Sequence, residues 1–141
     1  MPQLEVKAIH ASYDMSHVLF GVSFNVEAGQ CVSLIGRNGV GKTTTMRSII
    51  GLTPAHEGQI IFEGTDITRF PTHKIAKLGI AFVPEERHIF PELSVWENLD
   101  IARRQPLNGG TAWSEKEVYE LFPDLEEIRE RLGGVLSGGQ Q

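Results

Sequence analysis

The sequence holds one cysteine, no long apolar run and no excess of positive charge, and each shortage argues against one class of protein. Cys31 has no partner for an internal disulfide, and its place in an apolar stretch predicts a small buried side chain. No segment has the uninterrupted apolar length that spans a bilayer, and residues 1–6 lack the features of a signal peptide. A formal net charge of -5 argues against a broad electrostatic grip on nucleic acid. We therefore expect a cytosolic or peripheral protein that has no nucleic-acid partner.

The rest of the composition is that of an ordinary globular protein. Hydrophobic residues make up 40% of the 141 positions and charged residues 22%, which is enough for one domain with a core. The chain shows no internal repeat and no low-complexity segment. Specific motifs, and not composition, must therefore identify the function.

The stretch 36–44 reads Gly-Arg-Asn-Gly-Val-Gly-Lys-Thr-Thr and fits the phosphate-loop pattern G-x-x-x-x-G-K-[ST] at every fixed position. It lies between an apolar run at 31–35, which predicts a buried parallel strand, and a stretch at 43–50 with apolar residues at helical spacing. Its glycines let the backbone turn several N–H groups toward one anion at the helix N-terminus. The sequence therefore predicts a nucleotide site, in preference to a glycine-rich turn that happens to hold Lys-Thr.

Each polar residue of this loop has an expected role toward ATP and Mg²⁺. Lys42 would reach the β- and γ-phosphate oxygens, and the Thr43 hydroxyl would complete the coordination of the magnesium ion. Thr44 would support the α-phosphate. The other candidate ATP-binding residues of the loop are Gly36, Arg37, Asn38, Gly39, Val40 and Gly41.

The order of the elements predicts an α/β fold. Five further segments carry the pattern of a strand or a helix: 4–10, 18–26, 58–64, 71–78 and 80–83. The last two, a helix and an apolar strand, follow a strand, so they predict a right-handed crossover and a parallel sheet beside the phosphate-loop strand. Residues that follow such a strand face the ligand crevice, which places Glu85 at the site.

The remainder of the chain has a helical pattern. Two S-x-x-E capping boxes begin at Ser94 and Ser114, and each precedes apolar residues that share a helix face. The stretch 105–111 between these helices is expected to be a loop, and the charged stretch 125–132 to be a short helix with a solvated face.

The sequence Leu-Ser-Gly-Gly-Gln at 136–140 resembles the signature peptide of the ABC ATPases, and its presence with a phosphate loop makes chance a poor explanation. In that family two ATP-binding subunits sit head to tail, as identical or as related chains. The resemblance implies that Ser137, Gly138, Gly139 and Gln140 face the ATP held by the second subunit. The Ser137 hydroxyl and the two glycine N–H groups would then surround its γ-phosphate.

The resemblance also assigns residues outside the two motifs. Composition alone favours a core or surface role for Tyr13, but Tyr13 takes the place of the base-stacking aromatic of the family, and Val18 that of a small apolar residue beside the base. Glu85 stands where the family usually has a glutamine that senses magnesium and contacts the transmembrane partner. Thr43 and Glu85 are therefore the candidate magnesium ligands.

The stretch 83–99, which begins Val-Pro-Glu, resembles the ATP-binding subunits of branched-chain amino-acid importers, and the urea and short-chain amide importers look alike here. The resemblance implies a peripheral subunit on the cytoplasmic side of the membrane that powers import by binding and hydrolysing ATP. Transmembrane permease subunits would contact it at 85–98. The alternatives are a soluble ABC ATPase without a membrane partner and a truncated nucleotide-binding fragment without hydrolysis. The sequence of this chain does not identify the transported substrate.

The resemblance covers the whole chain as one ABC ATP-binding domain, 1–141, with the C-terminal part of the family's fold missing. It implies a core with a small antiparallel subdomain over 1–93 and a helical subdomain over 94–141. Family members continue with an aspartate that holds magnesium, a glutamate that polarises water and a switch histidine, so no catalytic residue can be assigned here. We expect the 141-residue chain to be a fragment that hydrolyses ATP negligibly, whereas the intact protein is an ATPase.

Overall fold

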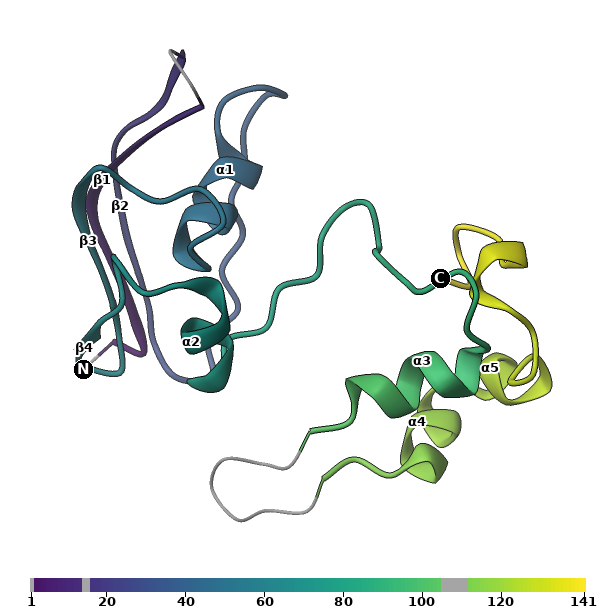
Figure 1. Cartoon of the computed structure of the whole chain (residues 1–141). Helices are drawn as coiled ribbons and strands as arrows, with labels where there is room; N and C mark the ends of the chain where they lie inside the picture. Colours follow the sequence, from purple (N-terminus) through teal and green to yellow (C-terminus); the bar gives the residue numbers. More distant parts are fainter. Residues whose placement is uncertain (1, 14–15, 105–111) are drawn as a thin grey trace. The chain divides into compact units, whose positions relative to one another are not determined.

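The computed structural model describes residues 2–13, 16–104 and 112–141, which fall into two compact units, Met1–Phe82 and Val83–Gln141 (Figure 1). The loop predicted at 105–111 lies outside the described residues. Among the described residues, no helix combines the length and the apolar character that crossing a bilayer requires.

The first unit is built on a four-stranded antiparallel sheet with the strand order β2-β1-β3-β4. The strands are β1 (Leu4–Tyr13), β2 (Ser16–Val26), β3 (Glu57–Phe62) and β4 (Thr65–Asp66). Along β1, Val6, Ile9 and Ala11 are buried on one face of the sheet. A positive φ of 44° at Ala8, between Val6 and Ile9, accompanies a shift in register that keeps both of these side chains inward.

Two helices, α1 (Lys42–Ile49) and α2 (Thr72–Lys77), cover the same face of this sheet (Figure 1). Ile49 of α1 and Ile75 of α2 pack into the apolar core of the unit, and each is at most 6% exposed. Burying one such side chain contributes about 1.5–3 kcal/mol, so the core fixes both helices on the sheet. The other buried core residues are Val6, Ile9, Ala11, Leu19, Ala55, Ile60 and Ile67.

The parallel strands predicted at 31–35 and 80–83 are absent from this structure. Among the described residues neither segment pairs with a strand, and the strands that do pair are antiparallel. Ile35 is 94% exposed and Val83 89% exposed, and Cys31, predicted to be buried, is exposed as well. A buried parallel strand needs neighbours that complete its hydrogen bonds and cover both of its faces, and the described residues supply neither. The prediction of a parallel sheet and of a buried Cys31 was therefore wrong.

The second unit is helical, as predicted. Its elements are α3 (Val95–Ala102), α4 (Glu115–Leu121), α5 (Pro123–Glu127) and the short 3₁₀ turn η1 (Gly133–Val135). The helix predicted at 125–132 is shorter and begins earlier, at the proline whose fixed φ suits the first helical turn.

Both predicted capping boxes are present. The Ser94 N–H donates to Glu97 Oε2 at 2.7 Å while Glu97 N–H donates to Ser94 Oγ at 3.2 Å, and Ser114 and Glu117 repeat the pattern. The N–H and hydroxyl of Ser94 both donate to the Glu97 carboxylate and lower its pKa, and the hydroxyl and N–H of Ser114 lower the pKa of the Glu117 carboxyl in the same way. The starts of α3 and α4 are thus fixed by local sequence.

Gly58 of β3 lies directly against the backbone of β1, and a substitution there tests how closely the two strands pack. It has a φ of +87°, and a Cβ there would overlap the Ala8 carbonyl oxygen. Gly64, with a φ of +79°, has nothing within 4 Å of such a Cβ. We expect Gly64→Ala to lower the free energy of unfolding by about 1 kcal/mol, and Gly58→Ala by at least about 2 kcal/mol more, because backbone must move. Equal losses in denaturant unfolding would contradict this account of the sheet.

Candidate functional site

The phosphate loop follows the segment 31–35, which has no regular secondary structure, and leads into α1. Gly39 and Gly41 have φ values of 81° and 97°, which other residues rarely adopt, and α1 begins directly afterwards at Lys42. Gly41 is the N-cap residue and makes no side-chain capping bond. The first N–H groups of α1 are therefore left to an external acceptor at the positive end of the helix.

Contact with β2 fixes the position of this loop. A Cβ on Gly41 would lie 2.7 Å from Leu19 Cδ2, 3.4 Å from the Val18 carbonyl oxygen and 3.6 Å from Val18 Cγ1. Leu19 is itself buried in the core. The structure thus brings Val18, predicted to flank the base, directly beside the phosphate loop.

The Lys42 side chain is hydrogen-bonded to the backbone of the phosphate loop. Its Nζ donates to the carbonyl oxygens of Gly36, at 2.9 Å, and of Arg37, at 2.8 Å. Both acceptors are neutral, so a polyphosphate oxygen would be a stronger acceptor for the same ammonium group. The arrangement places the Lys42 ammonium group within the turn, and its contact with the phosphates of ATP stays a prediction.

The three threonines that follow Lys42 have different surroundings. Thr43 is exposed and Thr44 is 6% exposed. Thr45 Oγ1 donates to the Gly41 carbonyl oxygen at 2.9 Å, which ties the loop to the first turn of α1. The phosphate-loop pattern ends at Thr43, so it did not reveal this role of Thr45. An exposed hydroxyl at Thr43 fits Mg²⁺, which takes few protein ligands and keeps water and phosphate oxygens.

The remaining predicted loop residues lie open to solvent. Arg37, Asn38, Gly39 and Val40 are exposed, and Val40 is 55% exposed despite its apolar side chain. A Cβ on Gly36 would lie 2.9 Å from Val40 Cγ2, so these two residues close the turn on one another. Because the turn is exposed, a ligand can reach it from solvent, as the predicted nucleotide site requires.

Tyr13 lies at the end of β1 and is 42% exposed. Its hydroxyl accepts a hydrogen bond of 3.2 Å from Thr53 Oγ1, and Thr53, which follows α1, is buried. No sequence pattern revealed this hydrogen bond, because its two residues belong to different elements. The bond fixes the hydroxyl end of the ring, while base stacking by Tyr13 stays a prediction.

The signature peptide lies in the second unit, directly after η1. The Ser137 N–H donates to Gln140 Oε1 at 3.0 Å, and the Gln140 N–H donates to the Ser137 carbonyl oxygen at 2.9 Å. Ser137, Gly138, Gly139 and Gln140 are exposed, so the peptide is open to a ligand. Glu85 is also exposed in this unit, whereas Thr43 belongs to the first unit, and their shared role toward magnesium stays a prediction.

Backbone hydrogen bonds join the chain before the signature peptide to the predicted permease-facing segment 85–98. The Gly133 N–H donates to the Leu93 carbonyl oxygen at 2.8 Å, and the Gly134 N–H to that of Pro91 at 2.9 Å. The Asn98 side chain accepts from the Phe90 N–H at 2.8 Å and donates to the Phe90 carbonyl at 3.0 Å. The two motifs of this unit are therefore held together by bonds that depend on backbone position.

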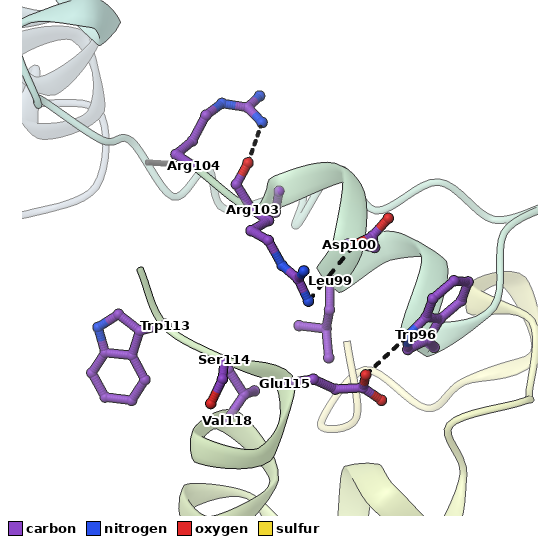
Figure 2. Close-up of a pocket in the computed structure, with 10 residues that line it drawn as sticks. Trp96, Leu99, Asp100, Arg103, Arg104, Trp113, Ser114, Glu115 and Val118 are labelled. Atoms are coloured by element: carbon purple, nitrogen blue, oxygen red, sulfur yellow. Dashed lines mark hydrogen bonds and ion pairs between the residues drawn. The ribbon is translucent and has the colours of Figure 1, made fainter. Parts of the chain in front are cut away.

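Figure 2 shows a separate pocket between α3 and α4, with a volume of about 320 Å³. Trp96 Nε1 donates to Glu115 Oε2 at 3.0 Å across it, and Arg103 lies 3.8 Å from Asp100 (Figure 2). Its other lining residues are Leu99, Ala102, Arg104, Trp113, Ser114 and Val118. No residue of the phosphate loop or the signature peptide lines it.

Residues 19–141 match the family model described as ABC transporter. The chain is 35% identical over 138 residues to the probable branched-chain amino acid transport ATP-binding protein LivF of Archaeoglobus fulgidus, covering 98% of this chain and 58% of that protein. It is also 35% identical over 143 residues to the lipopolysaccharide export system ATP-binding protein LptB of Escherichia coli strain K12, covering 100% and 59%.

A solved structure has a similar backbone. The crystal structure of a nucleotide-free ATP-binding cassette from an ABC transporter matches with a TM-score of 0.72 and 33% sequence identity, covering 99% of this chain and 61% of that one. The chain thus spans about three fifths of the length of these relatives.

Lys42 provides the most direct test of the site. We expect Lys42→Ala to weaken the binding of a fluorescent ATP analogue at least about tenfold, because the charge-assisted bonds to phosphate are lost. Lys77→Ala, at the exposed C-terminal end of α2, is the matched control and should bind as the wild type does. Similar affinities for Lys42→Ala and Lys77→Ala in a titration would show that nucleotide binds elsewhere.

Proposed function

This chain belongs to the ABC transporter family, and we propose that it is part of a subunit that powers an ABC importer by binding and hydrolysing ATP. The family match and the similar cassette backbone confirm the predicted fold class, an ABC-type α/β ATPase with an antiparallel subdomain and a helical one. The observation that carries the proposal is the phosphate loop, which opens α1 with Lys42 seated inside its turn.

Each residue of this loop would bind a different part of the triphosphate of ATP. The open N-terminus of α1 receives phosphate oxygens, and Lys42 exchanges its two carbonyl acceptors for them. The Thr43 hydroxyl would hold Mg²⁺, which would supply positive charge that neutralises the phosphates. Tyr13 and Val18 would hold the base, since an aromatic face and an apolar neighbour bind any base by stacking and contact.

The signature peptide would complete the site of a second ATP-binding subunit, which is either an identical or a related chain. Its exposure and its helical turn after Ser137 suit contact with an anion brought by another molecule. ATP would then stabilise the closed pair through contacts of the γ-phosphate, and loss of that phosphate would favour opening. The segment 85–98, which is hydrogen-bonded to the chain before the signature peptide, would pass this movement to transmembrane permease subunits.

The proposed cargo is a branched-chain amino acid, or a related amide or urea. The resemblance of the stretch 83–99 to importers of this branch supports it, and so do the relatives named for branched-chain amino acid transport. A relative named for lipopolysaccharide export is equally similar, so export of a lipid is the second candidate. In either case the subunit would work at the cytoplasmic face of the membrane, and nucleic acid would not be a partner.

Transport in living cells separates these candidates. Cells that lack the gene should take up radiolabelled leucine, isoleucine and valine several-fold more slowly, and the wild-type gene should restore uptake while Lys42→Ala should not. Lys77→Ala is again the control. Normal amino-acid uptake together with a defect in the outer membrane would replace the importer by a lipid exporter, and no transport defect at all would favour a soluble ABC ATPase.

A further inference from the structure

In the second unit the guanidinium group of Arg87 lies against the signature peptide. A Cβ on Gly138 would lie 2.7 Å from Arg87 Nη1, 3.4 Å from Cζ and 3.5 Å from Nη2. The three distances show that the Nη1 end of the guanidinium group lies nearest to the position where a side chain of residue 138 would begin. The contact joins the predicted permease-facing segment directly to the peptide that would meet ATP.

An unusual turn directs Arg87 to this position. Arg87 and His88 have φ values of 60° and 38°, a region that residues other than glycine rarely enter. The turn is held by hydrogen bonds from the Arg87 N–H to the Pro84 carbonyl oxygen at 3.2 Å and from the His88 N–H to that of Glu86 at 2.8 Å. A relaxed backbone at this turn would send the Arg87 side chain in another direction.

The charges around Arg87 leave its guanidinium available to an anion. Its acidic neighbour Glu86 lies 3.6 Å from His88 Nε2. Within the described parts of the chain, no ion pair includes Arg87. Arg87 is exposed, as are Gly138 and its neighbours Ser137 and Gly139.

We propose that Arg87 is a phosphate-binding residue of the signature half of the site, where it presents a positive charge to the γ-phosphate of ATP held by a second subunit. This inference rests on the proposed function, because it requires two subunits that share ATP. A guanidinium group suits the task, since its planar fork binds two phosphate oxygens at once and keeps its charge at any physiological pH. Because Arg87 belongs to the segment 85–98, loss of the γ-phosphate would remove a contact made by that segment itself.

The contact with Arg87 also explains why residue 138 is a glycine. A methyl group there would meet the mobile end of a side chain and not backbone, so Gly138→Ala would displace the guanidinium without breaking the peptide. The effects of changing Arg87 and Gly138 should therefore overlap.

The test uses the full-length protein and a non-hydrolysable ATP analogue, with dimer formation followed by sedimentation. We expect Arg87→Gln to raise the analogue concentration for half-maximal dimerisation about tenfold, and Arg87→Lys to restore part of the loss. ADP, which lacks the γ-phosphate, should bind each variant as it binds the wild type. Arg103→Gln, in the same unit and 3.8 Å from Asp100, is the matched control and should behave as the wild type does.

The outcomes separate this inference from the proposed function. If Lys42→Ala still binds the analogue, or if the wild type binds it without dimerising, the proposed function fails, and the inference falls with it. If both behave as expected but Arg87→Gln matches Arg103→Gln, only the inference fails. The variant that combines Arg87→Gln with Gly138→Ala tests the contact itself. If its half-maximal analogue concentration is no higher than that of Arg87→Gln alone, the contact is supported. If the effects of the two substitutions add, the contact is overturned.

Discussion

The contact between Gly41 and β2 is the constraint on which the nucleotide site depends. Only a residue without a side chain can bring the start of α1 so close to Leu19, a buried residue of the core. The same core holds Ile49 at the other end of α1, so the helix is fixed at both ends. This anchoring sets the position of the positive end of the helix. It also sets the positions of Lys42, which is bonded to the loop, and of the exposed Thr43.

The second unit achieves a similar precision by other means. The chain before its signature peptide is held by hydrogen bonds between backbone groups of 91–95 and 131–134. Asn98 adds the side-chain bonds that fix Phe90 within this arrangement. Because these bonds join the segment 85–98 to the chain before the signature peptide, one of the two can shift only if the other follows or the bonds break.

Local patterns could be predicted from the sequence, and long-range pairing could not. The phosphate loop, the capping boxes at Ser94 and Ser114 and the strands β1 and β2 depend on neighbouring residues, and all of them are present. The strands predicted at 31–35 and 80–83 depend on partners elsewhere, so their apolar pattern was not sufficient. The contacts of Tyr13 with Thr53 and of Arg87 with Gly138 join distant positions, and no spacing rule could reveal them.

The central claim is that ATP binds at the turn closed by Lys42, and amide resonances measured by NMR would test it most directly. On addition of magnesium and a non-hydrolysable ATP analogue, we expect the largest shifts in residues 36–44, because their N–H groups would gain phosphate acceptors while Lys42 leaves the carbonyls of Gly36 and Arg37. Smaller shifts should appear at Tyr13 and Val18. Shifts confined to other residues, or none at a saturating concentration, would contradict the account.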